Sequence, residues 1–354
     1  MSQTVPSSAR RAAGAVPPSG ATAVTDHRPR ALLLARGAVR TPEAAATAVS
    51  IGVLTAVLLV QLAAPGVWDR WGWLVLVAGL LIGLPHGAVD HLVPAFLLRQ
   101  DAPRLVLVIA GYAGTAVAAW AVFRSVPAVA LSVFVVLSVL HFGAGEVGFD
   151  AERAGRAPRF PLRDPLAVLA TGGAALLLPV LREPATSAPL IALLVPGSSG
   201  MLPVWLTRTT VLLVLGAVFL TCAHRVARRR LLGAGEVALL AGVGLLVSPL
   251  AAFGAYFGAW HALRHIARMV SDDPANTPDL ARGRLRRPLT RFAVAAAAPT
   301  AVSLAALAGL WALAGGWRGF VTANLALLAG LTLPHVLVVT WADRRHAAGA
   351  RGRR

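Results

Sequence analysis

Residues 71–92 read WGWLVLVAGLLIGLPHGAVDHL, an apolar run interrupted near its C-terminal end by His86, Asp90 and His91. A run of roughly 20 apolar residues is long enough for one helix across a bilayer. An ionisable side chain within such a span is costly and marks a functional site by default. The stretch therefore predicts a membrane-spanning helix that carries a polar site.

The composition of the whole chain agrees with this prediction. Of its 354 residues, 57% are hydrophobic and 14% are charged, and the mean hydropathy is +0.70. Soluble domains carry about 25% charged residues. The composition excludes a soluble enzyme and predicts an all-α fold, a polytopic transmembrane helical bundle.

Apolar stretches of bilayer length recur along the chain. Ser248 and Pro249 separate the seventh stretch from the eighth, although these two could instead form one long kinked helix, because proline bends a helix where it removes a hydrogen bond. Residues 187–200 are expected to form a re-entrant or interfacial piece. The sequence thus predicts about nine or ten transmembrane helices, at 45–64, 71–98, 105–123, 126–148, 165–182, 203–223, 235–250, 251–270, 290–314 and 318–341.

The arginines predict the topology. If the N-terminus is inside, the arginine clusters of 224–234 and 271–289 lie on cytoplasmic loops and the outer loops carry isolated charges, as the positive-inside rule requires. We therefore expect a multi-pass protein of the plasma membrane with N- and C-termini in the cytoplasm. Its expected parts are a disordered, basic cytoplasmic leader at 1–44, a transmembrane domain at 45–342 and a basic cytoplasmic tail at 343–354.

Charge and residue usage exclude several functions. The formal net charge is +18, but the basic residues lie in short clusters between the spans, so we expect the lipid bilayer as a partner and no nucleic acid. The sequence contains no lysine, so it cannot hold retinal as a Schiff base and is not an opsin. Because Cys222 is the single cysteine, any metal site must use His, Asp or Glu.

Six of the nine histidines lie inside predicted spans, and these spans all run from outside to inside in the expected topology. At 1.5 Å per residue, four of the six lie at one depth, roughly 20 to 25 Å below the outer surface. Helices packed side by side can bring such residues to a common centre. The alternative is a polar relay or packing network. The six are His86, His91, His141, His261, His265 and His335.

The spacing of the histidines indicates which of them share a helix face. His261 and His265 are four residues apart and lie on one face, the spacing by which a helix supplies two ligands to one metal. His91 is five residues from His86 and so faces elsewhere, whereas Asp90 shares the face of His86 and could accept its imidazole N–H. The best-fitting ligand set is His86, His141, His261 and His265, a neutral set suited to Fe(II), Cu, Zn or Ni.

Other polar and aromatic residues near these histidines are candidates for supporting roles. His335 is either a fifth ligand or part of a pocket wall, and Glu146 is a weaker candidate than Asp90 for supporting a ligand. Phe253 and Phe257 share a ridge with the histidine pair, and Trp260 lies beside it. These aromatics represent either ordinary helix packing or a wall for a long apolar substrate that enters from lipid.

Four short motifs in order carry a resemblance to a known family. They are GLPHGAVDH at 83–91, LHFG at 140–143, FGAWHALRH at 257–265 and LPH at 333–335. In these residues the sequence resembles the Brp/Blh family of bacterial β-carotene 15,15'-dioxygenases, named for bacteriorhodopsin-related proteins. The match runs from the second span to the last.

The resemblance implies a non-haem iron dioxygenase, with residues 45–342 as its carotenoid-cleaving domain. Such an enzyme splits the central 15,15' double bond of β-carotene with O2 and yields two molecules of all-trans-retinal. It also implies Fe(II) as the cofactor, held by His86, His141, His261 and His265. The retinal would serve a retinal-binding rhodopsin.

Two other functions are compatible with histidines in a membrane. The first is another His-ligated iron oxidase, such as a desaturase or hydroxylase of the di-iron type, although this chain lacks the HxxHH motif of those enzymes. The second is a non-enzymatic transporter that binds a metal or haem, although the spans contain few polar pathway residues.

Overall fold

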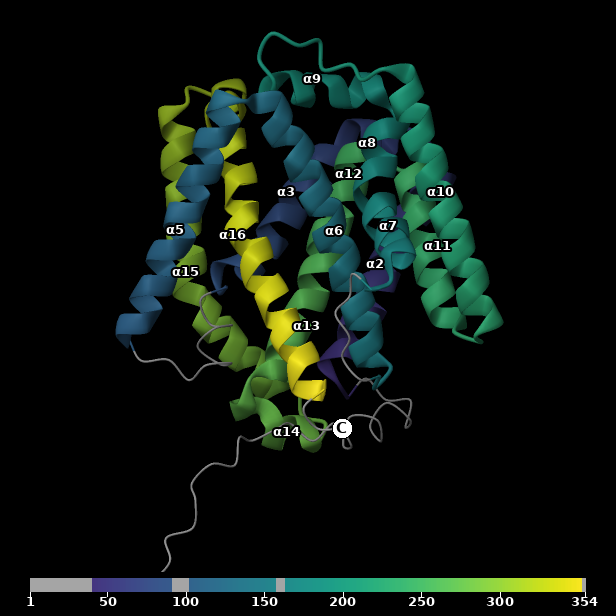
Figure 1. Ribbon diagram of the computed structural model, residues 1–354, viewed down its shortest axis with the longest axis vertical. Helices are drawn as coiled ribbons and strands as arrows, with labels where there is room; N and C mark the ends of the chain where they lie inside the picture. The colour runs from purple at the N-terminus through teal and green to yellow at the C-terminus, as the bar shows by residue number, and fades with distance from the viewer. Residues whose placement is uncertain (1–39, 91–101, 157–162, 352–354) are drawn as a thin grey trace, which may run out of the picture.

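The computed structural model describes residues 40–90, 102–156 and 163–351, and within these ranges the chain is helical and contains no strand (Figure 1). This confirms the predicted all-α bundle. Wide π-helical turns, η2 (Gly173–Leu177) and η3 (Tyr256–Ala262), interrupt two of the α-helical units, and a short 3₁₀ turn, η4 (Pro274–Asn276), follows α13. The α-helices are α2 (Pro42–Ala63), α3 (Val67–Ala88), α5 (Ala102–Ser125), α6 (Pro127–Arg153), α7 (Pro165–Gly172), α8 (Leu178–Arg182), α9 (Pro184–Leu194), α10 (Val204–Ala227), α11 (Leu231–Leu246), α12 (Pro249–Ala255), α13 (Leu263–Asp272), α14 (Thr277–Ala281), α15 (Arg286–Leu313) and α16 (Trp317–Arg351).

Proline marks the start of many of these helices. The ring of proline presets the helical φ angle, and the first turn needs no N–H donor, so proline suits this position. The side chains of Thr41 and Asp164 cap two of these starts by accepting hydrogen bonds from the backbone N–H groups of Ala44 and Ala167. The helices that begin in this way are α2, α6, α7, α9 and α12.

Among the described residues, eight helical units are long and apolar enough to cross a membrane, and they coincide with eight of the ten predicted spans. This supports a multi-pass membrane protein. The other two predicted spans, 235–250 and 251–270, form α11, which has 16 residues, and the continuous unit α12–η3–α13. They are separate helices rather than one kinked helix, because the chain is extended at Val247 (φ −93°, ψ 143°) and α12 starts at Pro249.

The structure adjusts several predicted boundaries. Residues 1–39 of the predicted leader lie outside the described residues, and α2 begins at Pro42 rather than at 45. The second span ends as helix at Ala88, and the rest of its predicted range, from 91, lies outside the described residues. The predicted tail at 343–354 begins as helix, because α16 continues to Arg351. Within 187–200 the chain forms the end of α9, which lies across one end of the bundle (Figure 1).

The α12–η3–α13 unit lies in the middle of the bundle and packs against α2 and α3. Its contact with α3 is made by glycines, which let two helix backbones approach closely. A Cβ atom placed on Gly79 would lie 2.0 Å from the backbone oxygen of Gly254, and Gly258 also meets the backbone of Gly79. The position of α3 relative to the unit is therefore fixed by backbone contact.

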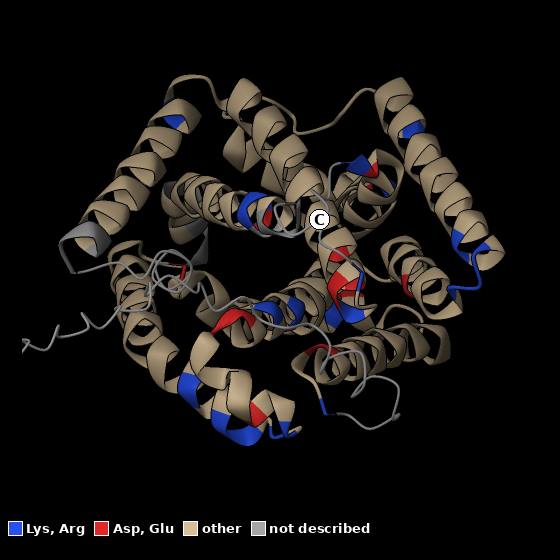
Figure 2. Ribbon diagram, turned by 60° about the horizontal axis from the view of Figure 1, so that its bottom comes forward, with Lys and Arg blue, Asp and Glu red and all other residues tan. Residues whose placement is uncertain are grey.

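The two ends of the bundle differ in charge. The α2 end at Pro42 and the α16 end at Arg351 lie at the same end, the one that carries α14 (Figure 1). Figure 2 brings this end forward and shows arginines and acidic residues side by side within the bundle. This end of the bundle therefore carries charged residues of both signs close together.

Candidate metal centre

His86 lies in the last turn of α3 and directly follows Pro85, which lies inside the helix. Its Nδ1–H donates a hydrogen bond to the carbonyl oxygen of Gly83. This bond fixes the tautomer, because a neutral imidazole carries one proton and the other nitrogen then holds a lone pair. Nε2 of His86 therefore carries the lone pair.

His261 and His265 lie on the unit that η3 interrupts. His261 is inside the π-helical turn and His265 is in the first turn of α13. Their rings are stacked, with centroids 6.4 Å apart and planes at 16°. Wide turns of this kind are rare and are frequent at functional sites. The two rings therefore face the same side, as their spacing predicts.

His141 on α6 and His335 on α16 complete the cluster. The ring centroid of His141 lies 5.1 Å from that of His261 and 4.9 Å from that of His335. His86 lies 5.4 Å from His261, 5.5 Å from His265 and 5.1 Å from His335 by the same measure. The common centre predicted from the shared depth is confirmed, although a ligand role for each residue stays a prediction. His91 lies outside the described residues.

The donor set fits a metal ion. The ligand atoms of His86, His261 and His335 all lie within 4.8 Å of one another, and all five imidazoles are at most 8% exposed. A buried polar atom without a partner is costly. Among the described residues, no hydrogen-bond partner exists for the Nε2 atoms of His141, His261, His265 and His335. Inward-facing imidazole nitrogens of this kind are what a transition metal would satisfy.

Asp90 has a different partner from the predicted one. Its carboxylate does not accept a hydrogen bond from Nδ1–H of His86, which donates to the carbonyl oxygen of Gly83 instead. Both oxygens of Asp90 instead accept from Nδ1–H of His335, at 3.0 and 2.9 Å, and Oδ2 also accepts from the hydroxyl of Tyr112 at 2.9 Å. The spacing on α3 could not reveal this, because the partner lies on α16.

The aromatic residues divide between two sides of the unit. Phe253 and Phe257 are half-buried and stacked, with centroids 5.7 Å apart, and Phe257 contacts the ring of His86. Trp260 is fully buried and does not belong to this wall, because its ring lies under the guanidinium of Arg264, 3.7 Å from its Cζ. Two further rings, Phe142 and Tyr256, contact His261.

Glu146 pairs with an arginine rather than with a ligand histidine. Nη1 of Arg264 lies 2.7 Å from Oε2 of Glu146, and Nη2 lies 2.7 Å from Oε1 of Glu236 on α11. All three side chains are at most 5% exposed. Glu236 also accepts two hydrogen bonds from Arg153, at 2.6 and 2.7 Å. In the sequence, only the position of Arg264 between His261 and His265 could have indicated its importance.

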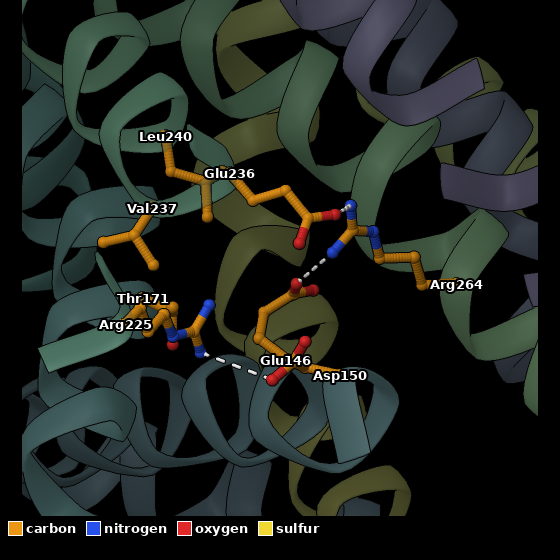
Figure 3. A pocket seen from close by; sticks show the side chains of 8 residues that line it. All are labelled: Glu146, Asp150, Thr171, Arg225, Glu236, Val237, Leu240 and Arg264. Carbon is orange, nitrogen blue, oxygen red and sulfur yellow. Dashed lines mark hydrogen bonds and ion pairs between the residues drawn. The ribbon is translucent and has the colours of Figure 1, made fainter. Parts of the chain in front are cut away.

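This charge network encloses a small polar cavity with room for about one water molecule. Figure 3 shows Arg264 reaching Glu146 and Glu236 on one side, and Arg225 facing Asp150 on the other. The lining residues are Glu146, Asp150, Thr171, Arg225, Glu236, Val237, Leu240 and Arg264. The cavity is thus part of the ion-pair network and contains none of the clustered histidines.

A second ion-pair group fixes α13 to two other helices. Nη2 of Arg268 lies 2.5 Å from Oδ1 of Asp343 on α16, and the guanidinium donates to both oxygens of Glu152 on α6. Asp343 was assigned to the cytoplasmic tail by sequence, yet it is 7% exposed. These pairs hold together three helices that carry histidines of the cluster.

Two comparisons with known proteins cover most of the chain. The family model described as beta-carotene 15,15'-dioxygenase matches residues 77–343, which contain all five clustered histidines. A protein of Halobacterium salinarum named probable beta-carotene 15,15'-dioxygenase Blh is 34% identical over 331 residues, covering 84% of this chain and 90% of that relative. No solved structure matches the chain. The extent of both matches shows that the chain belongs to the β-carotene 15,15'-dioxygenase family.

Proposed function

We propose that this chain cleaves the central 15,15' double bond of β-carotene with O2 and yields two molecules of all-trans-retinal. The reaction would take place at a non-haem iron(II) centre held by His86, His141, His261 and His265. The observation that carries the proposal is the cluster of five buried imidazoles, four of which have an Nε2 atom without a partner among the described residues, namely His141, His261, His265 and His335. Membership of the family supports the substrate and the bond that is cleaved.

The choice of iron follows from the donor set and the reaction. Neutral imidazoles suit Fe(II), Cu, Zn or Ni and suit Mg or Ca poorly. A reaction with O2 requires a metal that changes its redox state, which excludes Zn. When bound, iron(II) would supply the site at which O2 is activated beside the alkene. The protein side chains supply the ligands, the apolar walls and the exclusion of water.

The substrate is a hydrocarbon, so the protein can hold it only by apolar contact. The half-buried stack of Phe253 and Phe257 leads to the ring of His86, and Phe257 also stacks on His261 at 6.1 Å. Phe142 and Tyr256 contact His261 as well. We place the polyene along the stack of Phe253 and Phe257, so that its central double bond reaches the imidazoles. Burial of the imidazoles keeps water from the reacting atoms.

The cellular setting follows from the substrate and the charges. β-Carotene partitions into the bilayer, and we place the protein in the plasma membrane with its charged end and both termini in the cytoplasm. Residues 45–342 then form the carotenoid-cleaving domain, and the sequence on either side of it is basic. The chain has no lysine to hold retinal covalently, so the product would pass to another protein, such as a retinal-binding rhodopsin.

Expression in a bacterium that accumulates β-carotene tests the proposal. We expect two molecules of retinal for each β-carotene lost, measured by extraction and chromatography, and no loss without O2. Removal of metal from the purified protein with a chelator should abolish cleavage, and Fe(II) but not Zn(II) should restore it. Folded, iron-loaded protein that leaves β-carotene intact would refute the proposal. Two irons per chain or a haem absorption spectrum would instead favour a di-iron desaturase or a haem-binding transporter.

A further inference from the structure

We propose that His335 is a fifth imidazole ligand of the metal, held in position by the carboxylate of Asp90 and, through that carboxylate, by Tyr112. This inference rests on the proposed function, because it adds one ligand to the four histidines named above. It assigns a role to the last long helix, α16, which none of those four ligands occupies. The geometry around His335 supports it in three ways.

The first support is the position of His335 among the other rings. Its centroid lies 4.9 Å from that of His141, 5.1 Å from that of His86 and 5.5 Å from that of His265. Its ligand atom also lies within 4.8 Å of those of His86 and His261. His335 therefore approaches all four of the proposed ligands, whereas a residue of an outer wall would face the cluster from one side.

The second support is the hydrogen bond that fixes its tautomer. Nδ1 of His335 lies 3.0 and 2.9 Å from the two oxygens of Asp90, and the hydroxyl of Tyr112 already donates to one of these oxygens. An ionised carboxylate can only accept, so Nδ1 carries the proton and Nε2 carries the lone pair. A carboxylate bonded to the far nitrogen of an imidazole is the usual arrangement around metal-ligating histidines.

The third support is the state of the remaining nitrogen. Nε2 of His335 is buried and has no hydrogen-bond partner among the described residues. A histidine kept only for packing would satisfy both nitrogens, because a buried polar atom without a partner is costly. His335 also resembles His86, since each directly follows a proline inside its helix and each has its Nδ1–H bonded to a protein oxygen.

Cobalt binding to the full-length protein in detergent tests the inference without using activity. Co(II) is the probe, since its visible absorption bands change with the number of ligands. We expect His335→Ala to weaken Co(II) binding and alter the bands, and added imidazole to restore the original bands. Asp90→Asn should weaken binding about 10- to 100-fold, the usual effect of losing the partner of a ligand histidine. Tyr112→Phe should have a smaller effect of the same sign.

His224→Ala is the matched control, because His224 is an exposed histidine of α10 and lies outside the cluster. If His335→Ala does not fold, Asp90→Asn provides the test, since it preserves the shape of the side chain. Wild-type affinity and bands in both His335→Ala and Asp90→Asn, with binding lost in His86→Ala, would overturn the fifth ligand and leave the proposed function intact. A wild-type protein that binds neither cobalt nor iron would refute the proposed function itself.

Discussion

Two sides of the α12–η3–α13 unit, here called the imidazole side and the arginine side, differ in whether their polar groups are paired. His261 and His265 contact the histidine cluster, and their Nε2 atoms have no partner among the described residues. Arg264, one residue before His265, is bonded to Glu146 and Glu236. Arg268, one turn further on, is bonded to Glu152 and Asp343. The same helix therefore carries unpaired imidazoles on one side and fully paired guanidinium groups on the other.

The difference shows that acidic partners are available close to the cluster. Carboxylates from α6, α11 and α16 reach α13, yet they pair with arginines. Among the described residues, Asp90 is a carboxylate that does reach a clustered histidine, and it binds Nδ1 of His335 and leaves Nε2 without a partner. The imidazole side thus keeps unpaired nitrogens, and the arginine side is bonded to three neighbouring helices.

The largest expected effect comes from removing an imidazole. We expect His261→Ala and His86→Ala to lose iron and to abolish retinal formation, because each removes a proposed ligand, while the protein stays folded in the membrane. Metal analysis of purified protein and retinal chromatography measure the two losses. His224→Ala should behave as wild type. Cleavage that persists in either ligand variant would show that the unpaired imidazoles are not the metal site.

The second-largest effect is expected from removing the guanidinium group of Arg264 on the arginine side. Arg264→Ala leaves Glu146 and Glu236 buried with one partner fewer, and breaking a buried pair costs about 3–5 kcal/mol. We expect a lower thermal unfolding temperature in detergent, with Arg264→Lys losing less. The hydrogen bonds of Arg264 go to Ser50, Glu146 and Glu236 and not to a clustered histidine. Added iron should therefore still bind the folded fraction. An unchanged unfolding temperature would contradict a structural role for the arginine side.

A smaller effect is expected where the unit packs on α3. A methyl group on Gly79 would clash with the backbone of Gly254, and overpacking of this kind costs about 1–3 kcal/mol. Gly79→Ala should lower the unfolding temperature and also reduce cleavage, because α3 carries His86. Gly111→Ala is the control, since its Cβ would meet no atom within 4 Å. Equal behaviour of the two variants would show that the glycine contact does not position the imidazole side.

The smallest effect is expected at the ion pair between Arg268 and Asp343. Asp343→Asn removes one negatively charged partner of Arg268, which keeps its hydrogen bonds to both oxygens of Glu152. We expect a loss of about 1 kcal/mol, the usual contribution of one hydrogen bond, measured by thermal unfolding. Asp69→Asn, an exposed position on α3, should cause no change. A loss as large as that of Arg264→Ala would mean that Asp343 holds α16 in place by itself.

The sequence predicted the features that depend on local pattern. Apolar runs located eight of the membrane-spanning helices, and the shared depth of the histidines predicted their meeting point. The pairing of buried groups between helices was not predictable, because spacing on one helix says nothing about its neighbours. Asp90 therefore binds His335 instead of His86, and Glu146 binds Arg264. For Trp260 the sequence left packing and a substrate wall open, and the structure shows packing, with the ring under the guanidinium of Arg264.

The π-helical turn η3 sets the angular phase between the two halves of the central unit. On the N-terminal side of η3, Gly254 packs against the backbone of α3. On its C-terminal side, Arg264 and His265 lie on the arginine side and the imidazole side. Since each residue of a helix advances the chain by about 100°, one residue fewer within 256–262 would rotate the lower half by that angle. The position of His265 would then pass to a neighbouring residue. The turn thus acts as a one-residue spacer between the part of the unit that packs on α3 and the part that carries His265.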